Sequence, residues 1–237
     1  MANLKEIVDL INKGNLKEAL TLCVTYENEK NKKFILNFRG VIHLIEGNLD
    51  IAEKNFLDAV VIDSKFINPL KNLYLIFLKK SNYKDLLTFA QKLIEADRFE
   101  NEYNYKLAYA FELNNNLKDS IEYYKRYIDK KGKNSKQALN NIGCIYLKRK
   151  KPKIAINFFK QGLNLGKDKI IINNTFKCYV LLRDLENSDL YYDKARKIDE
   201  NYIEFKHTKA KYLILKNQIA EAIEILRENI DKPRFLV

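Results

Sequence analysis

The sequence contains few residues that could carry out acid–base or nucleophilic chemistry. Its two histidines, His43 and His207, have no recognisable nucleophile beside them. There is no Gly-rich phosphate loop, no G-x-S-x-G elbow and no dinucleotide-binding turn. Cys144 has no neighbour in sequence that would lower its pKa and activate its thiol. The sequence therefore predicts a protein that is not an enzyme and has no catalytic residues.

Metal and cofactor sites are also not expected. The three cysteines, Cys23, Cys144 and Cys178, are far apart, and no Cys-x-x-Cys pair or Cys/His cluster occurs. Unpaired cysteines are typical of a reducing compartment, so we expect a cytoplasmic protein. The first 15 residues include acidic side chains and no long apolar core, which argues against a signal peptide. No window approaches the ~18 apolar residues of a membrane-spanning helix, so no membrane insertion is expected.

The net charge of +12 favours acidic partners, nucleic acid or an anionic membrane surface, and does not choose among them. Heavy use of Lys and Asn, with no Trp, indicates genome bias, so single surface lysines carry little weight. The stretch KRKKPK, residues 148–153, could be a nucleic-acid patch or a nuclear signal. We interpret it instead as a solvated turn, and a nucleic-acid partner is not expected.

Apolar spacing around this basic stretch predicts two short helices. Before it, Leu139, Ile142, Gly143 and Tyr146 are spaced so that they share one helix face. After it, the same spacing recurs at Ala155, Phe158, Phe159 and Gly162. Two such helices cannot bury their apolar faces alone, so they are expected to be one unit of a larger array.

That unit repeats along the chain with a period of about 34 residues. Steps of this size from Ala155 reach a small residue at nearly every repeat, and the apolar context recurs around each one. The anchors are Ala19, Ala52, Leu86, Ser120, Ala155, Ser188 and Ala222. A small anchor lets two helix backbones approach closely. Leu86 breaks the rule, but Ala90 follows it by four, so the large and small residues have exchanged places.

This pattern resembles the tetratricopeptide repeat family, a 34-residue helix-turn-helix motif with small and aromatic residues at fixed positions. Gly143, Tyr146, Ala155, Phe159 and Gly162 match the motif position for position. About seven repeats are in phase, starting near residues 1, 33, 67, 101, 136, 169 and 203. The resemblance implies an all-α solenoid, a right-handed superhelix of about 14 helices that forms one domain over residues 1–237.

The resemblance also implies a binding groove lined by the first helix of each repeat. In the family, asparagines at the sixth motif position often form a ladder that holds the backbone of an extended peptide. An Asn amide suits this role because it offers a donor and an acceptor. The candidate groove residues here are Asn72, Lys106, Asn141 and Asn174 at that position, with Asn37, Lys71, Tyr105, Asn140 and Asn173 beside it. The alternative is asparagine enriched by genome bias on solvated helices.

The predicted function is a protein–protein interaction scaffold that binds an extended peptide in this groove. Acidic peptides are among the candidates, because the residues assigned to the groove include more basic than acidic side chains. One alternative is a targeting module of, or for, an enzyme such as a glycosyltransferase. A lesser alternative is an RNA-binding helical repeat. The family's clamp for a C-terminal carboxylate is incomplete in every frame. The last helix is expected to run toward Ile230 and to stop at Pro233. Its face with Ile223 and Leu226 would then be exposed, or would contact a partner or a second copy of the protein. Alternatively, the chain once continued into a further domain.

Overall fold

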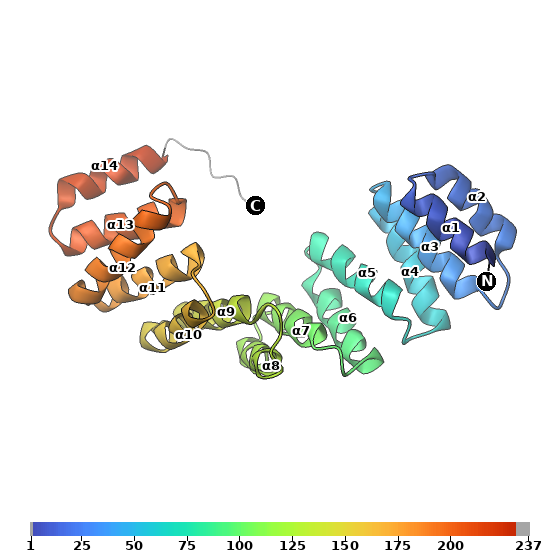
Figure 1. Cartoon of the computed structure of the whole chain (residues 1–237), viewed down its shortest axis with the longest axis horizontal. Coiled ribbons are helices and arrows are strands. Elements are labelled where there is room, and N and C mark those ends of the chain that lie inside the picture. Colours follow the sequence, from blue (N-terminus) through green and yellow to red (C-terminus); the bar gives the residue numbers. More distant parts are fainter. Residues whose placement is uncertain (1, 231–237) are drawn as a thin grey trace. The chain divides into compact units, whose positions relative to one another are not determined.

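The computed structural model describes residues 2–230, and over this range it contains fourteen α-helices and no β-strand (Figure 1). The predicted all-α class is therefore confirmed. In chain order the helices are α1 (Ala2–Asn12), α2 (Leu16–Tyr26), α3 (Lys32–Ile45), α4 (Leu49–Ile62), α5 (Ile67–Lys79), α6 (Tyr83–Ala96), α7 (Glu102–Leu113), α8 (Leu117–Asp129), α9 (Ser135–Lys148), α10 (Pro152–Asn164), α11 (Lys169–Leu182), α12 (Leu185–Ile198), α13 (Ile203–Leu215) and α14 (Ile219–Ile230).

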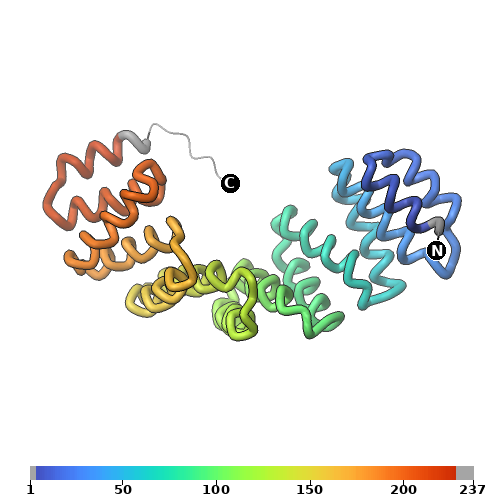
Figure 2. The backbone as a smooth tube through the Cα atoms, in the orientation of Figure 1, coloured from blue at the N-terminus to red at the C-terminus, as the bar shows by residue number. Residues whose placement is uncertain are grey.

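The helices form hairpins, and further contacts join neighbouring hairpins within each part of the chain. Contacts join α3 to α4, α9 to α10 and α11 to α12 within hairpins, and α4 to α5, α6 to α7 and α10 to α11 between them. The tube in Figure 2 shows this alternation along the chain. Each odd-numbered helix begins within one residue of a predicted repeat start. The 34-residue period is thus the length of one helical hairpin with its two connections.

The chain divides into two compact units, residues 1–123 and residues 124–237, with the division inside α8. Unit 1 contains α1 to α7 and the first part of α8. Unit 2 contains the rest of α8 and α9 to α14. A single solenoid domain over the whole chain remains a prediction. Within residues 2–230, no helix is both long and apolar enough to cross a bilayer.

A left-handed backbone residue closes the turn inside each hairpin. The seven residues are Gly14, Gly47, Ser81, Asn115, Lys150, Arg183 and Asn217, with φ between 54° and 82°. In the turn between α9 and α10, the amide of Lys150 donates to the carbonyl of Leu147, and the amide of Lys151 donates to that of Tyr146. These bonds satisfy carbonyls that the end of α9 would leave unpaired. A positive φ is disfavoured for residues with a side chain, so the repeated geometry is imposed by the packing of the hairpin.

The small anchors lie at helix contacts, as their spacing predicts. All seven anchor residues, from Ala19 to Ala222, are at most 1% exposed. Leu86 and Ala90 are both fully buried, which fits the exchange of a large and a small residue in that hairpin. Ser120 and Ser188 have hydroxyl oxygens with no hydrogen-bond partner in the described structure. At these anchors the size of the side chain matters and its hydroxyl does not.

Glycines bring the two helices of a hairpin together in each unit. A Cβ built on Gly143 would lie 2.3 Å from Cε1 of Phe159, and one built on Gly40 would lie 2.5 Å from Cε1 of Phe56. Both rings are fully buried. Only glycine leaves room for an aromatic ring against the backbone of the facing helix.

Aromatic residues twelve positions apart pair across the two helices of four successive hairpins. The pairs are Phe77–Phe89, Phe111–Tyr123, Tyr146–Phe158 and Tyr179–Tyr191, with ring centroids 5.3–5.6 Å apart. Each pair joins the first helix of a hairpin to the second. The aromatic stripe therefore stabilises each hairpin from within, and it is core rather than a ligand-binding surface.

The last described helix has an exposed apolar face. Ile223 and Leu226 of α14 are 43% and 40% exposed, and in residues 2–230 no helix follows α14. Pro233, predicted to stop this helix, lies outside the described residues. Self-association through this face remains a prediction.

Candidate functional site

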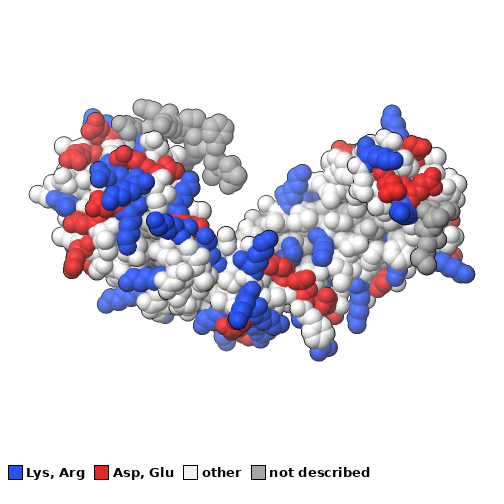
Figure 3. All heavy atoms as spheres, viewed as in Figure 1, with Lys and Arg blue, Asp and Glu red and all other residues white. Residues whose placement is uncertain are grey.

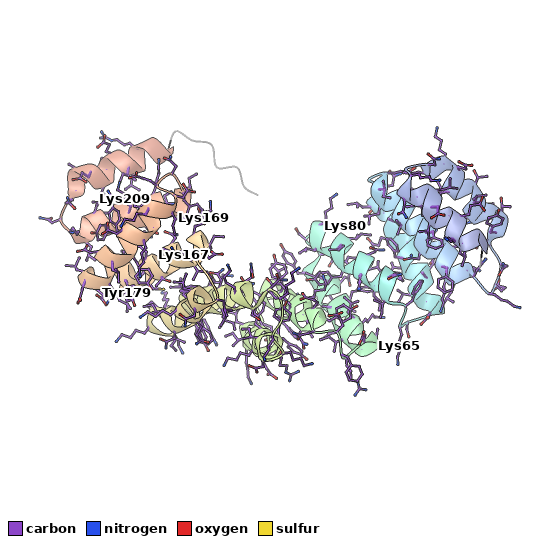
Figure 4. All side chains as sticks on the ribbon, viewed as in Figure 1. Lys65, Lys80, Lys167, Lys169, Tyr179 and Lys209 are labelled. Atoms are coloured by element: carbon purple, nitrogen blue, oxygen red, sulfur yellow. The ribbon has the colours of Figure 1, made fainter. Side chains whose placement is uncertain are left out.

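Unit 2 contains a hollow of about 510 Å³ on the face formed by α11 and α13. Figure 4 locates these two helices through the labelled side chains of Tyr179 on α11 and Lys209 on α13. The lining residues are Asn173, Asn174, Lys177, Glu204, His207, Thr208, Ala210, Lys211, Ile214 and Leu226. Asn173 and Asn174 are two of the groove candidates, and all lining residues except Leu226 belong to the first helices of repeats, as the resemblance implies for the groove. The hollow therefore coincides with part of the expected groove in unit 2.

Asn173 lies in the wall of this hollow with an unsatisfied amide. Its side chain is 2% exposed, and its Oδ1 atom has no hydrogen-bond partner in the described structure. An acceptor that is buried without a partner costs about 1–3 kcal/mol. Apolar residues could fill this position at no such cost, so the amide calls for an explanation other than packing.

The neighbouring Asn174 is held by two side chains of α9. Its Nδ2 atom lies 3.0 Å from Oδ1 of Asn140, to which it donates, and 3.5 Å from Sγ of Cys144. The two donor hydrogens of the Asn174 amide are therefore directed at α9, and its oxygen is the atom left for another group. Asn140 and Asn174 form one polar cluster at the junction of two repeats, next in sequence to Asn173.

Asn141 bonds to a residue outside that cluster. Its Nδ2 atom donates to the hydroxyl of Tyr124, 2.9 Å away, and the Tyr124 ring is fully buried. This bond joins α9 to the part of α8 that belongs to unit 2. Asn141 thus has a structural partner, although it shares a motif position with Asn174. An asparagine ladder along the groove remains a prediction, and in unit 2 the two asparagines at the ladder position are already engaged within the protein.

In unit 1, the candidates Lys71 and Lys106 lie against tyrosine rings of the neighbouring helix. The Nζ atom of Lys106 is 4.7 Å from the centroid of the Tyr74 ring, and that of Lys71 is 5.7 Å from the centroid of the Tyr103 ring. Burial lowers the pKa of Lys106; Glu102 partly opposes this and Lys71 adds to it. The two ammonium groups are therefore close enough to repel each other, and they form a cationic pair on α5 and α7.

The remaining candidates of unit 1 differ in exposure. Asn37 on α3 is buried, and its Oδ1 atom has no partner in the described structure, as for Asn173. Asn72 on α5 and Tyr105 on α7 are partly exposed. Burial raises the pKa of Tyr74, and the neighbouring Tyr109 and Tyr105 raise it further. Unit 1 therefore places Lys71, Tyr105 and Lys106 together.

The hollow in unit 2 has mixed charge with a cationic excess. Lys177 and Lys211 contribute ammonium groups and Glu204 contributes a carboxylate, all exposed. A ligand with one or two carboxylates would find more opposite than like charge here.

The lining residues that are absent from the sequence-based candidates include two apolar ones, Ile214 and Leu226. Both are exposed, at 49% and 40%. Leu226 belongs to α14, a second helix, whereas the motif assigns the groove to first helices only. Its contribution could have been inferred from the exposed apolar face expected on the final helix. The described residues contain no group of three metal-binding side chains.

The three cysteines are expected to differ in their rates of thiol alkylation. Cys23 and Cys178 are buried, and burial raises their pKa values to about 11 and about 12. Cys144 is partly exposed beside the polar cluster. Only thiolates react, so iodoacetamide at pH 8 should modify Cys144 at least ten times faster than the other two. Peptide mass mapping over time measures this. Equal rates for Cys144 and Cys178 would contradict the placement of Cys178 in the core.

Comparison with known proteins agrees with this architecture. The family model described as tetratricopeptide repeat matches residues 136–167. This segment is the α9–α10 hairpin with the loop that follows it, and it holds all five residues on which the resemblance was first based. No curated protein sequence matches the chain.

Solved structures share the fold at low sequence identity. A tetratricopeptide repeat protein from Parabacteroides merdae has a TM-score of 0.69 at 14% identity, covering 99% of this chain and 95% of that one. MamA has a TM-score of 0.66 at 16% identity, covering 74% and 96%. YrrB, described as a TPR protein with an unusual peptide-binding site, has a TM-score of 0.56 at 16% identity, covering 76% and 94%. The chain thus has the tetratricopeptide-repeat fold, and residues 136–167 are a tetratricopeptide repeat by sequence.

Proposed function

We propose that this protein is a non-enzymatic scaffold that binds an extended segment of a partner protein in the hollow of unit 2. Asn173 carries the proposal, because its buried acceptor has no partner in a wall that faces open space. The χ2 angle of Asn turns easily, so the amide can present its oxygen to a ligand. A backbone N–H of an extended peptide is the donor that it would accept.

The other lining residues suit the rest of such a segment. The oxygen of Asn174 offers a second acceptor, while Ile214 and Leu226 offer apolar contacts for a side chain. Lys177 and Lys211 favour a peptide with acidic side chains. Peptide sites in proteins commonly combine backbone hydrogen bonds, which provide affinity, with side-chain pockets, which provide specificity. YrrB, with its peptide-binding site, offers a precedent for this kind of ligand on the same fold.

Replacing Asn173 by Leu should separate stability from binding. The change removes a buried, unpaired acceptor and keeps the branching and the number of side-chain heavy atoms, so the melting temperature should stay the same or rise. The ligand loses one hydrogen bond worth roughly 0.5–1.5 kcal/mol, so its affinity should fall by about 2- to 12-fold. The ligand for the test is a 16-residue peptide selected from a displayed random library on the wild-type protein. Its affinity is measured by isothermal titration calorimetry.

Ser188→Ala is the matched control. Ser188 also has a buried oxygen without a partner, but it lies at a helix contact and does not line the hollow. Its replacement should leave the peptide affinity unchanged. A bound peptide should also slow the alkylation of Cys144, which adjoins Asn174. Peptides that bind Asn173→Leu as tightly as the wild type, without slowing this reaction, would contradict the proposal.

A further inference from the structure

The excess positive charge of this protein is confined to one segment of the sequence. Residues 124–168 contain 13 Lys and Arg and only 2 acidic residues, Asp129 and Asp168. The other 192 residues contain 30 basic and 29 acidic residues and are almost neutral. Nearly all of the net charge of +12 therefore belongs to residues 124–168.

Genome bias does not explain this distribution, because a bias toward lysine would act on the whole chain. The segment also differs by its lack of carboxylates: none occurs between Asp129 and Asp168, whereas elsewhere acidic and basic residues are nearly equal in number. A surface that lacks carboxylates attracts a polyanion more strongly, because each carboxylate would repel the polyanion and would pair with a lysine.

The cations lie at both ends of one helix. At the N-terminal end of α9, the loop after α8 carries Lys130, Lys131 and Lys133. At its C-terminal end, the turn before α10 carries Arg149, Lys150 and Lys151, all exposed. The 14 residues of α9 place these two groups about 21 Å apart. We refer to the residues of the two groups together as the basic strip.

Further cations lie beside the basic strip. Lys125 of α8 lies over the Phe158 ring of α10, with 6.0 Å between its Nζ atom and the ring centroid, so α8 and α10 are neighbours. The Nζ atom of Lys136 lies 4.0 Å from a carboxylate oxygen of Asp168, which brings the loop after α10 beside the start of α9. That loop carries Lys167, labelled in Figure 4. Figure 3 shows Lys and Arg side chains gathered over α8 in this view.

We propose that the basic strip binds the phosphate backbone of nucleic acid without sequence preference. Its length of about 21 Å is enough to contact several successive phosphates of one strand. Phosphate contacts need cations and no pocket, and they supply most of the affinity of non-specific nucleic-acid binding. This activity is additional to peptide binding in the hollow, which lies on α11, α13 and α14.

Other polyanions fit the strip less well. A membrane-binding surface combines basic residues with large apolar side chains that insert between lipids. In residues 124–168 only Ile154 and Leu165 are large, apolar and exposed. They lie near opposite ends of α10, so they form no common anchor. An acidic peptide would gain little binding energy here beyond charge attraction, because Ile154 and Leu165 are the only large, exposed apolar side chains of this segment that it could contact.

The test uses a fluorescein-labelled 20-nucleotide oligouridine and fluorescence anisotropy over a range of salt concentrations. Wild-type protein should bind with a logarithm of affinity that falls linearly with the logarithm of salt, with a slope of about −0.7 for each phosphate contacted. The variant R149Q/K150Q/K151Q should reduce the size of this slope by about 2 and weaken binding at 0.1 M salt by at least about tenfold. Circular dichroism should show unchanged helix content, because these side chains are exposed.

The matched control is K54Q/K65Q/K84Q, which removes the same charge from exposed positions of unit 1. It should bind the oligonucleotide within about twofold of the wild type, since its effect is limited to screened, long-range attraction. Equal losses in the two variants would overturn the proposal, because they would show a response to net charge alone. Absence of binding by the wild type at 50 mM salt would overturn it as well.

Two further ligands distinguish the class of polyanion. A 20-residue polyglutamate has similar charge without phosphates, and vesicles with 30% phosphatidylserine present a charged surface. The proposal expects the oligonucleotide to bind at least about ten times more tightly than polyglutamate, and it expects R149Q/K150Q/K151Q to leave vesicle sedimentation unchanged. Polyglutamate binding of equal strength, or vesicle binding that depends on these three residues, would overturn it.

Discussion

Ala155→Arg is expected to lower the free energy of unfolding by about 3 kcal/mol or more. Ala155 is fully buried at the contact of α9 and α10. An arginine there adds a long side chain to a packed interface, where overpacking alone costs about 1–3 kcal/mol. Its guanidinium would also be buried without a carboxylate, because residues 130–167 contain none. The two costs act together on the hairpin that matches the family model most fully.

Asn157→Arg is the control for this prediction, since it places the same side chain two residues further along α10 at an exposed position. It should change the free energy of unfolding by no more than about 0.5 kcal/mol. Urea unfolding followed by circular dichroism measures both variants. If Ala155→Arg is as stable as Asn157→Arg, the assignment of the small anchor to a helix contact is wrong.

Gly143→Ala is expected to destabilise the protein by about 1–3 kcal/mol, although alanine is the better helix former. The added methyl group would lie 2.3 Å from a carbon of the Phe159 ring, which is fully buried and has little room to move. In an exposed helix interior the same change would stabilise by up to about 1 kcal/mol. The sign of the effect therefore reports the close approach of α9 and α10.

A double-mutant cycle with Phe159→Leu tests this explanation. The leucine side chain lacks the ring atoms nearest to the added methyl group, so Gly143→Ala should cost less in that background, by about 1 kcal/mol or more. Unfolding free energies of the four proteins give the coupling energy. A cost that is the same in both backgrounds would show that the strain at Gly143 does not come from Phe159. Gly40 and Phe56, with the same geometry in unit 1, should behave alike.

Part of the candidate site followed from the family resemblance together with the repeat period. The motif places Asn173, Asn174 and Lys177 on one face of the first helix of the sixth repeat, and all three line the hollow. This works because a helix with a fixed repeat length presents the same positions to the same side in every hairpin. The charge of residues 124–168 was also readable from the sequence, but the net charge of the whole chain conceals it.

The sequence by itself determined the repeat. Small anchors alternating with large aromatic residues can bury their faces only in stacked hairpins. The helical fold class, the hairpin length and the start of each repeat therefore follow from local pattern. Gly143 and Phe159 illustrate this, because the missing side chain on one helix matches the large ring on the other. Such information is local, since each hairpin spans only about 34 residues of sequence.

Only the tertiary structure decided which polar groups are available to a ligand. Asn141 and Asn174 occupy equivalent positions, yet one donates to Tyr124 and the other to Asn140. Asn173, one residue from Asn174, is left with a buried oxygen that has no partner in the described structure. The physical reason is that a hydrogen bond depends on where side chains of neighbouring helices meet, to within a few tenths of an ångström. A repeat period places a residue on a face of its helix, and it does not specify the partner across the contact.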